Sequence, residues 1–301
     1  MTATVSTARP TRAVVAPVRR RRSRWGPGRV VVAILVIIAL CVALAPVYWM
    51  VATSFKTPFA ATSLRPSYYP HQFSMSNYRE LLIKGAVPFK TFLFNSALTS
   101  VIASVVAVVI SALAGYSFSR SKWKLRGVTS VVVLTTQMLP LVVFVGPLYL
   151  LLLDAHLLNT YLGLIIGYTS FAIPFGSWLM KGFFDAVPVE LEEAARVDGY
   201  GRFSTLVRVV VPTVIPGLLT TGVFVFINSW NNLLYPLTLV TSNSRQTLPP
   251  GLLDSFVGQF NTDWGGMMAA AVITTVPLAI AFFAVQRSMV RGMTAGALAG
   301  T

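Results

Sequence analysis

The residues best suited to chemistry are acidic, and they are concentrated in one short segment of the chain. Carboxylates at close spacing can transfer protons, bind metal ions or pair with basic groups on another surface. The segment reads PVELEEAARVDGYGRF, residues 188–203, and it holds four of the nine acidic residues of the chain, namely Glu190, Glu192, Glu193 and Asp198.

The sequence lacks the residue patterns of common catalytic and metal sites. The two histidines, His71 and His156, are far apart, and the single cysteine, Cys41, is interpreted as a packing residue. The dipeptide Gly-Lys is absent, so the chain has no phosphate-binding loop of the Gly-x-x-x-x-Gly-Lys-Ser/Thr type. The sequence therefore predicts no catalytic residues, no metal site and no cofactor, and it disfavours a membrane-embedded enzyme.

The elements that must position the acidic segment are long apolar runs. Of the 301 residues, 55% are hydrophobic and only 11% are charged, whereas a soluble domain carries about 25% charged residues. A bilayer-spanning helix needs about 20 apolar residues, and the sequence predicts an all-α polytopic membrane protein with six transmembrane helices in the plasma membrane. The runs without Lys, Arg, Asp or Glu are 30–51, 92–115, 128–152, 161–180, 212–240 and 264–285.

The distribution of basic residues predicts the orientation. Most of the 24 Lys and Arg residues lie in the N-terminal tail, in the loops 116–127 and 181–211, and in the C-terminal tail. By the positive-inside rule, these segments and both termini are cytoplasmic. The net charge of +15 then follows from topology and attraction to anionic membrane lipid, so we expect no nucleic-acid binding.

Five segments follow from these expectations. The first apolar run is longer than the 7–15 residues of a signal peptide core, so it is interpreted as an uncleaved span. The segments are a disordered basic cytoplasmic tail (1–29), a first transmembrane helix (30–55), an external loop (56–91), a core of five helices with the loop 181–211 (92–286), and a cytoplasmic C-terminal tail (287–301).

Local signals predict a short helix, a turn and a second helix within the acidic segment. Pro188 suits a first helical turn, and the glutamates after it complement the helix dipole. Gly199 lies where a helix would end in a left-handed cap, and a second helix restarts after Gly201. Such a pair could rest on the lipid headgroups or dock on another protein. The acids favour docking, because the inner leaflet is negatively charged.

A family resemblance is carried by these same residues. The pattern Glu193-Ala194-Ala195, three residues, Gly199, nine residues, Val209-x-Val211-Pro212 resembles the Glu-Ala-Ala (EAA) motif of permease subunits of ATP-binding-cassette (ABC) importers. Further collinear stretches are similar to the maltose-type carbohydrate permeases of this class. They are Asn77-Tyr78, Asn95-Ser96, Gly115 to Arg120, Trp230-Asn231-Asn232, Tyr235-Pro236-Leu237 and the tail from Gly292.

The resemblance implies a type I ABC importer permease fold and a set of partners. These are a second, homologous permease, a dimer of ATPase subunits that binds ATP and Mg²⁺, an extracytoplasmic solute-binding protein, a sugar substrate and membrane lipid. The helix with the EAA motif would then be a coupling helix seated on the ATPase. The coupling positions implied are Glu193, Ala194, Ala195, Asp198, Gly199, Phe203 and Pro212.

A second polar cluster lies in the fifth apolar run. Asn228, Asn231, Asn232 and Tyr235 are spaced at i, i+3, i+4 and i+7, which predicts one helical face, and Trp230 lies among them. Amides bind hydroxyl groups and aromatic rings stack on sugars, so this face, together with Gln137 in the third run, is a candidate lining for a substrate pathway. The alternative is that the asparagines hydrogen-bond between helices.

Two classes of function remain open on the sequence. The first is a permease subunit that forms half of a sugar pathway and couples to a separate ATPase. The second is a passive channel or membrane scaffold without an ATPase partner.

Overall fold

The computed structural model describes residues 27–298 except 64, 66, 86 and 259–261. Most of the predicted N-terminal tail and the last three residues of the C-terminal tail lie outside the described residues. The chain divides into two compact units, residues 1–47 and 48–301, with the boundary inside the first helix. In the first unit, the described residues form the N-terminal part of α1, which is apolar as expected for the first span.

The described residues are almost entirely helical, and an isolated bridge between Val257 and Thr262 is their one β pairing. The α-helices are α1 (Pro27–Ser54), α2 (Pro58–Ala61), α3 (Ser76–Arg79), α4 (Phe89–Arg120), α5 (Arg126–Thr135), α6 (Leu141–Asp154), α7 (Tyr161–Asp185), α8 (Val189–Val197), α9 (Arg202–Thr205), α10 (Val211–Thr213), α11 (Ile215–Trp230), α12 (Leu234–Leu239), α13 (Leu248–Phe256) and α14 (Trp264–Leu298). Two π-helical turns, Glu80–Lys84 and Leu206–Val210, and two 3₁₀ turns, Thr136–Met138 and Asn243–Arg245, complete the set.

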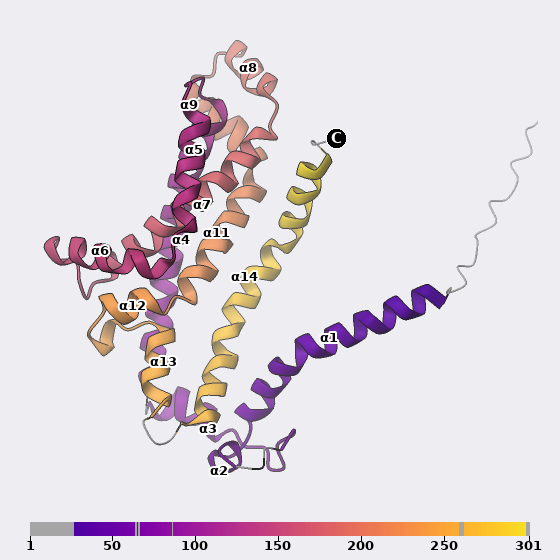
Figure 1. The fold of residues 1–301 in the computed structure, drawn as a ribbon, viewed down its shortest axis with the longest axis vertical. Coiled ribbons are helices and arrows are strands. Elements are labelled where there is room, and N and C mark those ends of the chain that lie inside the picture. The colour runs from indigo at the N-terminus through magenta and orange to yellow at the C-terminus, as the bar shows by residue number, and fades with distance from the viewer. Residues whose placement is uncertain (1–26, 64, 66, 86, 259–261, 299–301) are drawn as a thin grey trace, which may run out of the picture. The chain divides into compact units, whose positions relative to one another are not determined.

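The centre of the second unit is a close contact between α4 and α7, with α11 beside both and α14 against α11 (Figure 1). Small residues make the contact possible. A Cβ added to Gly115 on α4 would lie 2.7 Å from Met180 Cβ, and one added to Gly176 on α7 would lie 2.4 Å from Ser111 Oγ. Small residues at helix crossings let backbones approach closely, which is how membrane helices gain packing energy without a hydrophobic driving force.

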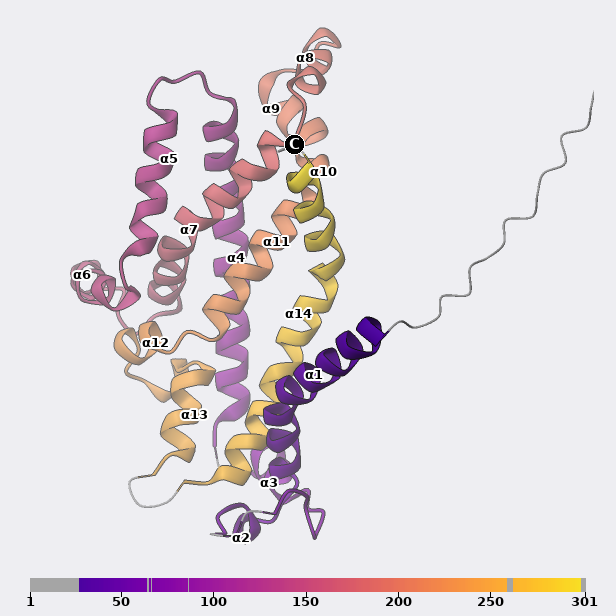
Figure 2. The same ribbon diagram turned by 45° about the vertical axis from the view of Figure 1, so that its right-hand side comes forward.

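The predicted spans are present as helices, but two of them are bent. Among the described residues, four helices are long and apolar enough to cross a membrane, and the number is six if each of two bent pairs is one span. The third run breaks by 98° between Met138 and Leu141, where Pro140 adopts an extended backbone and α6 starts in a new direction (Figure 2). The helices before and after Val214 meet at 77°. The runs 128–152 and 212–240 are therefore bent and not single straight helices.

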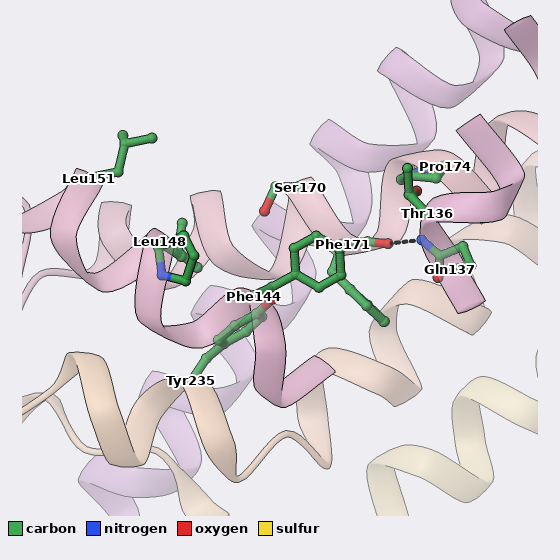
Figure 3. A pocket seen from close by; sticks show the side chains of 10 residues that line it. Thr136, Gln137, Phe144, Leu148, Leu151, Ser170, Phe171, Pro174 and Tyr235 are labelled. Carbon is green, nitrogen blue, oxygen red and sulfur yellow. Dashed lines mark hydrogen bonds between the residues drawn. The ribbon is translucent and has the colours of Figure 1, made fainter. Parts of the chain in front are cut away.

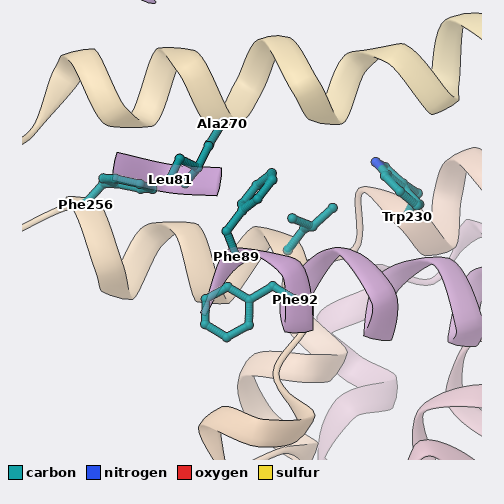
Figure 4. Close-up of a cluster of buried hydrophobic side chains, with 7 residues drawn as sticks. Leu81, Phe89, Phe92, Trp230, Phe256 and Ala270 are labelled. Carbon is teal, nitrogen blue, oxygen red and sulfur yellow. The ribbon is translucent and has the colours of Figure 1, made fainter. Parts of the chain in front are cut away.

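The end of the second unit opposite α8 is held by an aromatic cluster and by buried amides. Phe89 and Phe92 of α4 pack with Trp230 and Phe256 beside α14 (Figure 4). Asn95, also on α4, is fully buried.

The Asn95 side chain ties three segments together. Its amide nitrogen donates to the carbonyl oxygens of Ser244 at 3.0 Å and Gln246 at 2.8 Å, and its oxygen accepts from the Tyr161 hydroxyl at 2.8 Å. Because every polar atom of this buried amide is used, it fixes the loop after α12 against α4 and α7. Asn95 belongs to one of the stretches that carried the family resemblance, and this is its structural role.

Candidate functional site

The acidic segment forms the predicted helix and turn. The nine residues of α8 follow Pro188, with Glu190 and Glu192 in the first turn. The helix ends in a Schellman motif, because the Tyr200 N–H donates to Ala195 O at 3.0 Å and the Gly199 N–H donates to Arg196 O at 3.1 Å. Gly199 has a φ of +88°, which confirms the prediction of a left-handed cap.

The chain then returns as a second helix, as predicted, but its apolar residues divide between two surfaces. Leu206 and Val210 are buried with Met180 and Phe184 near the end of α7. Phe203, one of the implied coupling positions, is in contrast 75% exposed. An exposed aromatic ring on a short loop helix is a feature of binding surfaces.

The two sides of α8 have different surroundings. Glu193, Ala194 and Val197 point outward, and the Val197 side chain is 88% exposed. Glu192 and Ala195, three residues apart, face the protein and are buried. Ala195, which the resemblance placed among the coupling positions, therefore packs against its own chain and is not part of the exposed surface.

The remaining predicted coupling residues border the outward surface. Asp198 caps the C-terminal end of α8 and is exposed, as is Gly199 beside it. Pro212 is exposed in the single turn of α10, at the start of the bent return toward α11. The outward surface of α8–α9, defined here as Glu193, Ala194, Val197, Asp198 and Phe203, thus combines carboxylates with apolar groups.

The sequence missed the most deeply buried acid of the segment. Glu192 is 1% exposed, and its Oε1 lies 2.6 Å from Nε of Arg120, the last residue of α4. The Tyr116 hydroxyl donates to Glu192 Oε2 at 2.9 Å, and Arg196 NH2 lies 3.8 Å from the same oxygen. A carboxylate is buried at tolerable cost only when it is paired and hydrogen-bonded, as here. Tyr116 and Arg120 lie within the stretch from Gly115 to Arg120 that resembles the carbohydrate permeases. That resemblance was the signal in the sequence that could have pointed to partners for the acidic segment.

The second polar cluster is not one helical face. Helix α11 ends at Trp230 and α12 begins at Leu234, so Asn232 and Tyr235 do not continue the face of Asn228. Asn232 lies in the break between the two helices, and its Oδ1 accepts the N–H of Tyr235 in the first turn of α12 at 3.0 Å.

The individual side chains of that cluster also differ in exposure. Trp230 is buried in the aromatic cluster of Figure 4. Asn228 and Asn231 are exposed, and their amide nitrogens donate to carbonyls of α11 itself, Phe224 O at 2.8 Å and Ile227 O at 3.0 Å. Within the described part of the chain, the hydrogen bonds of these two amides stay inside α11, which does not support hydrogen bonding between helices.

A cavity of about 280 Å³ lies where the 3₁₀ turn Thr136–Met138, α6, α7 and α12 meet (Figure 3). Gln137 and Tyr235 both line it, so the structure brings together two residues that the sequence placed on different runs. The Gln137 amide donates to Phe171 O at 2.8 Å. The other lining residues are Thr136, Phe144, Pro147, Leu148, Leu151, Ser170, Phe171 and Pro174. Among the described residues, no group of three or more His, Cys, Asp or Glu side chains could hold a metal ion.

The arrangement is that of a multi-pass membrane protein with an exposed loop helix, and sequence comparison identifies its class. Residues 105–295 match the family model of the binding-protein-dependent transport system inner membrane component. The match covers more than half of the chain, which therefore belongs to this family of inner-membrane transport permeases. The predicted resemblance to ABC importer permeases is confirmed.

Curated relatives match over most of their length. The chain is 37% identical to the diacetylchitobiose uptake system permease protein DasC of Streptomyces coelicolor, over 85% of this chain and 91% of the relative. It is 33% identical to the sulfoquinovosyl glycerol transport system permease protein SmoH of Agrobacterium fabrum, over 85% and 88%. It is 32% identical to the trehalose/maltose transport system permease protein MalG of Thermococcus litoralis, over 90% and 97%.

A solved structure shares the fold. A chain of a bacterial ABC transporter involved in the import of the acidic polysaccharide alginate aligns with a TM-score of 0.74 at 24% identity, over 86% of this chain and 95% of that chain. This similarity confirms the all-helical permease fold that the sequence predicted.

Proposed function

We propose that this chain is one permease subunit of an ATP-driven importer for a sugar or oligosaccharide, and that α8 couples it to a separate ATPase. The observation that carries the proposal is the outward surface of α8–α9. It is held on a capped helix, and it exposes Glu193 and Asp198 beside the apolar Val197 and Phe203. A surface that mixes charge with exposed apolar groups fits a protein partner with basic and apolar residues.

The energy source belongs to the partner in this proposal. The chain has no phosphate-binding loop, so ATP and Mg²⁺ bind to the ATPase dimer and not to this subunit. A second, homologous permease supplies the other half of the pathway, and an extracytoplasmic solute-binding protein delivers the substrate. The family description, which names binding-protein-dependent transport, supports the solute-binding protein.

The proposed substrate class is a sugar or oligosaccharide. Three relatives transport, by their names, diacetylchitobiose, trehalose or maltose, and sulfoquinovosyl glycerol. We propose that the pathway passes Gln137 at the cavity and the exposed amides of Asn228 and Asn231, with Asn232, Tyr235 and Trp230 positioning those segments. Replacing Gln137 with Leu should then lower uptake of labelled diacetylchitobiose, trehalose or maltose, whichever the cells accumulate, while leaving the protein level unchanged.

The decisive experiment is purification of the tagged chain from its native membrane in mild detergent. A nucleotide-binding subunit should co-purify, and the eluate should hydrolyse ATP. The variant Glu193→Arg should lose most of that subunit, because it places a cation against the basic partner surface. The matched control is Glu80→Arg, which makes the same change in an exposed residue of the predicted external loop.

Two results would overturn the proposal. If no ATPase subunit is recovered with the unmodified chain, the passive channel or scaffold is the better reading. If Glu193→Arg retains the ATPase as well as Glu80→Arg does, the outward surface of α8–α9 is not the docking site.

A further inference from the structure

A buried network of polar side chains joins α8 to the ends of α4 and α7. Arg120 uses all three of its nitrogens, since Nε pairs with Glu192 at 2.6 Å, NH2 donates to Val187 O at 2.6 Å and NH1 donates to Ser119 Oγ at 3.0 Å. The fork of a guanidinium fixes direction as well as distance, because its donors lie in one rigid plane.

A second layer connects the same point to α7. The Ser119 hydroxyl donates to Asp185 Oδ1 at 2.6 Å, and Lys181 Nζ lies 2.5 Å from Asp185 Oδ2. Asp185 is the last residue of α7, and Val187 lies in the link from α7 to α8. The last turns of α4 and α7 and the first turn of α8 are therefore joined by side chains as well as by the main chain.

Polar burial of this kind is not needed for packing. An apolar residue at position 192 would fill the space and avoid the desolvation of a carboxylate, and buried ion pairs replaced in this way are often no less stable. An ion pair with hydrogen bonds differs from an apolar contact because it requires a particular geometry. The Arg120–Glu192 pair therefore holds α8 in one position relative to α4. The other neighbours of α8 are parts of its own loop, α9 and the turn Leu206–Val210.

We propose that Arg120, Tyr116 and Glu192 form a positioning clamp that makes α8 and the end of α4 move as one body. When the ATPase displaces α8, the clamp delivers that displacement to α4, and through the small-residue contact to α7. This inference rests on the proposed docking of an ATPase at the outward surface of α8–α9. Glu192 faces inward and acts through Arg120, so it is a positioning residue and not a docking residue.

The direct test is a distance measurement by spin labels in the purified complex. Cysteines replace Leu113, exposed on α4, and Val189, exposed on α8 and outside the outward surface of α8–α9, in a chain whose only cysteine is removed by Cys41→Ser. With the clamp intact, the distance distribution should be narrow and the same in the nucleotide-free complex and in the complex trapped with ATP and vanadate.

Breaking the clamp should release α8. Removing one partner of a buried pair shifts the equilibrium between attached and detached arrangements by on the order of 100-fold or more, so Glu192→Gln should broaden the distribution. Tyr116→Phe keeps the ion pair and removes one hydrogen bond, and it should broaden the distribution less. This second variant carries the test if Glu192→Gln does not fold. Glu80→Gln, the same substitution in the exposed Glu80–Lys84 pair, should change nothing.

The outcomes separate the clamp from the docking site. In Glu192→Gln, the ATPase should still co-purify, but the uptake per ATP hydrolysed should fall about tenfold or more. A residue that only stabilises the fold would not lower this ratio in an assembled complex. Unchanged distances in both Glu192→Gln and Tyr116→Phe would overturn the clamp and leave docking intact. A distance that changes with nucleotide in the unmodified chain would also overturn it. Failure of Glu193→Arg to release the ATPase would overturn the docking proposal instead.

Discussion

Replacing Gly199 with Ala should weaken the end of α8 through the backbone alone. The φ of Gly199 is +88°, a conformation that costs a residue with a side chain roughly 1–2 kcal/mol. No heavy atom lies within 4 Å of the position that the new Cβ would take, so no steric clash adds to this cost. The Schellman motif at the end of α8 should therefore be less stable by about 1–2 kcal/mol, and its two hydrogen bonds should open more often.

Gly201 provides a matched control without backbone strain. It lies two residues further along the same turn and is equally open, but its φ is −69°, which alanine adopts without strain. Alanine restricts the unfolded chain more than glycine does, which favours folding by about 0.4–1 kcal/mol. Glycine is the better N-cap residue, and Gly201 is the N-cap of α9, so the two effects should nearly cancel in Gly201→Ala. A general sensitivity of the loop to added methyl groups would instead affect both positions in the same direction.

Amide hydrogen exchange measures this difference directly. The N–H groups of Gly199 and Tyr200 close the motif, so a cost of 1–2 kcal/mol should speed exchange in peptides covering 195–203 by about 5–30-fold in Gly199→Ala. Gly201→Ala should leave it nearly unchanged. The reasoning is refuted if Gly201→Ala speeds exchange as much as Gly199→Ala, or if Gly199→Ala has no effect.

Three further predictions concern the body of the protein. Gly115→Ala should lower thermal stability in detergent by about 1–3 kcal/mol, because the added Cβ would lie 2.8 Å from a backbone atom of α7. Gly127→Ala is the control and should leave stability unchanged, because a Cβ there would meet no other atom. Asn95→Leu should lower the stability by about 1–3 kcal/mol for each buried partner left unpaired, measured by the same thermal unfolding. A variant as stable as the unmodified chain would show that water replaces the amide. Burial lowers the pKa of the Lys56 ammonium below its ordinary 10.5, so the unfolded chain binds the proton more tightly. Between the lowered pKa and 10.5, stability relative to Lys56→Met should therefore rise with pH, and a flat difference would contradict the burial.

Much of the loop around α8 could be predicted from sequence because its signals are local. Pro188, the glutamates and Gly199 each act within one or two turns, and the helix, its cap and the second helix all follow from them. The inward position of Glu192 could not be predicted in this way. Three glutamates in a nine-residue helix do not show which one faces the protein, and its partner Arg120 is 72 positions away in the chain.

The breaks in the apolar runs were missed for a different reason. Proline is tolerated inside membrane helices, so Pro140 and Pro147 look alike in the sequence, yet the chain turns at Pro140 and continues as a helix through Pro147. Hydropathy counts apolar residues but does not measure direction. The prediction of one face from Asn228 to Tyr235 failed similarly, because the spacing of these residues fits a single helix, yet Asn232 lies in the break between α11 and α12 and accepts the Tyr235 N–H there.

The bend between α5 and α6 has a consequence for the lipid around the protein. It lies near the middle of an apolar run, and the backbone of Leu139 and Pro140 there is extended and not helical. Hydrocarbon cannot hydrogen-bond to peptide groups, so irregular backbone at that depth must be enclosed by protein or hydrated. The bend thus marks a sector of the membrane cross-section from which acyl chains are excluded. A cysteine introduced at position 139 should react with a water-soluble thiol reagent if that sector is hydrated, and stay unreactive if a neighbouring subunit encloses it.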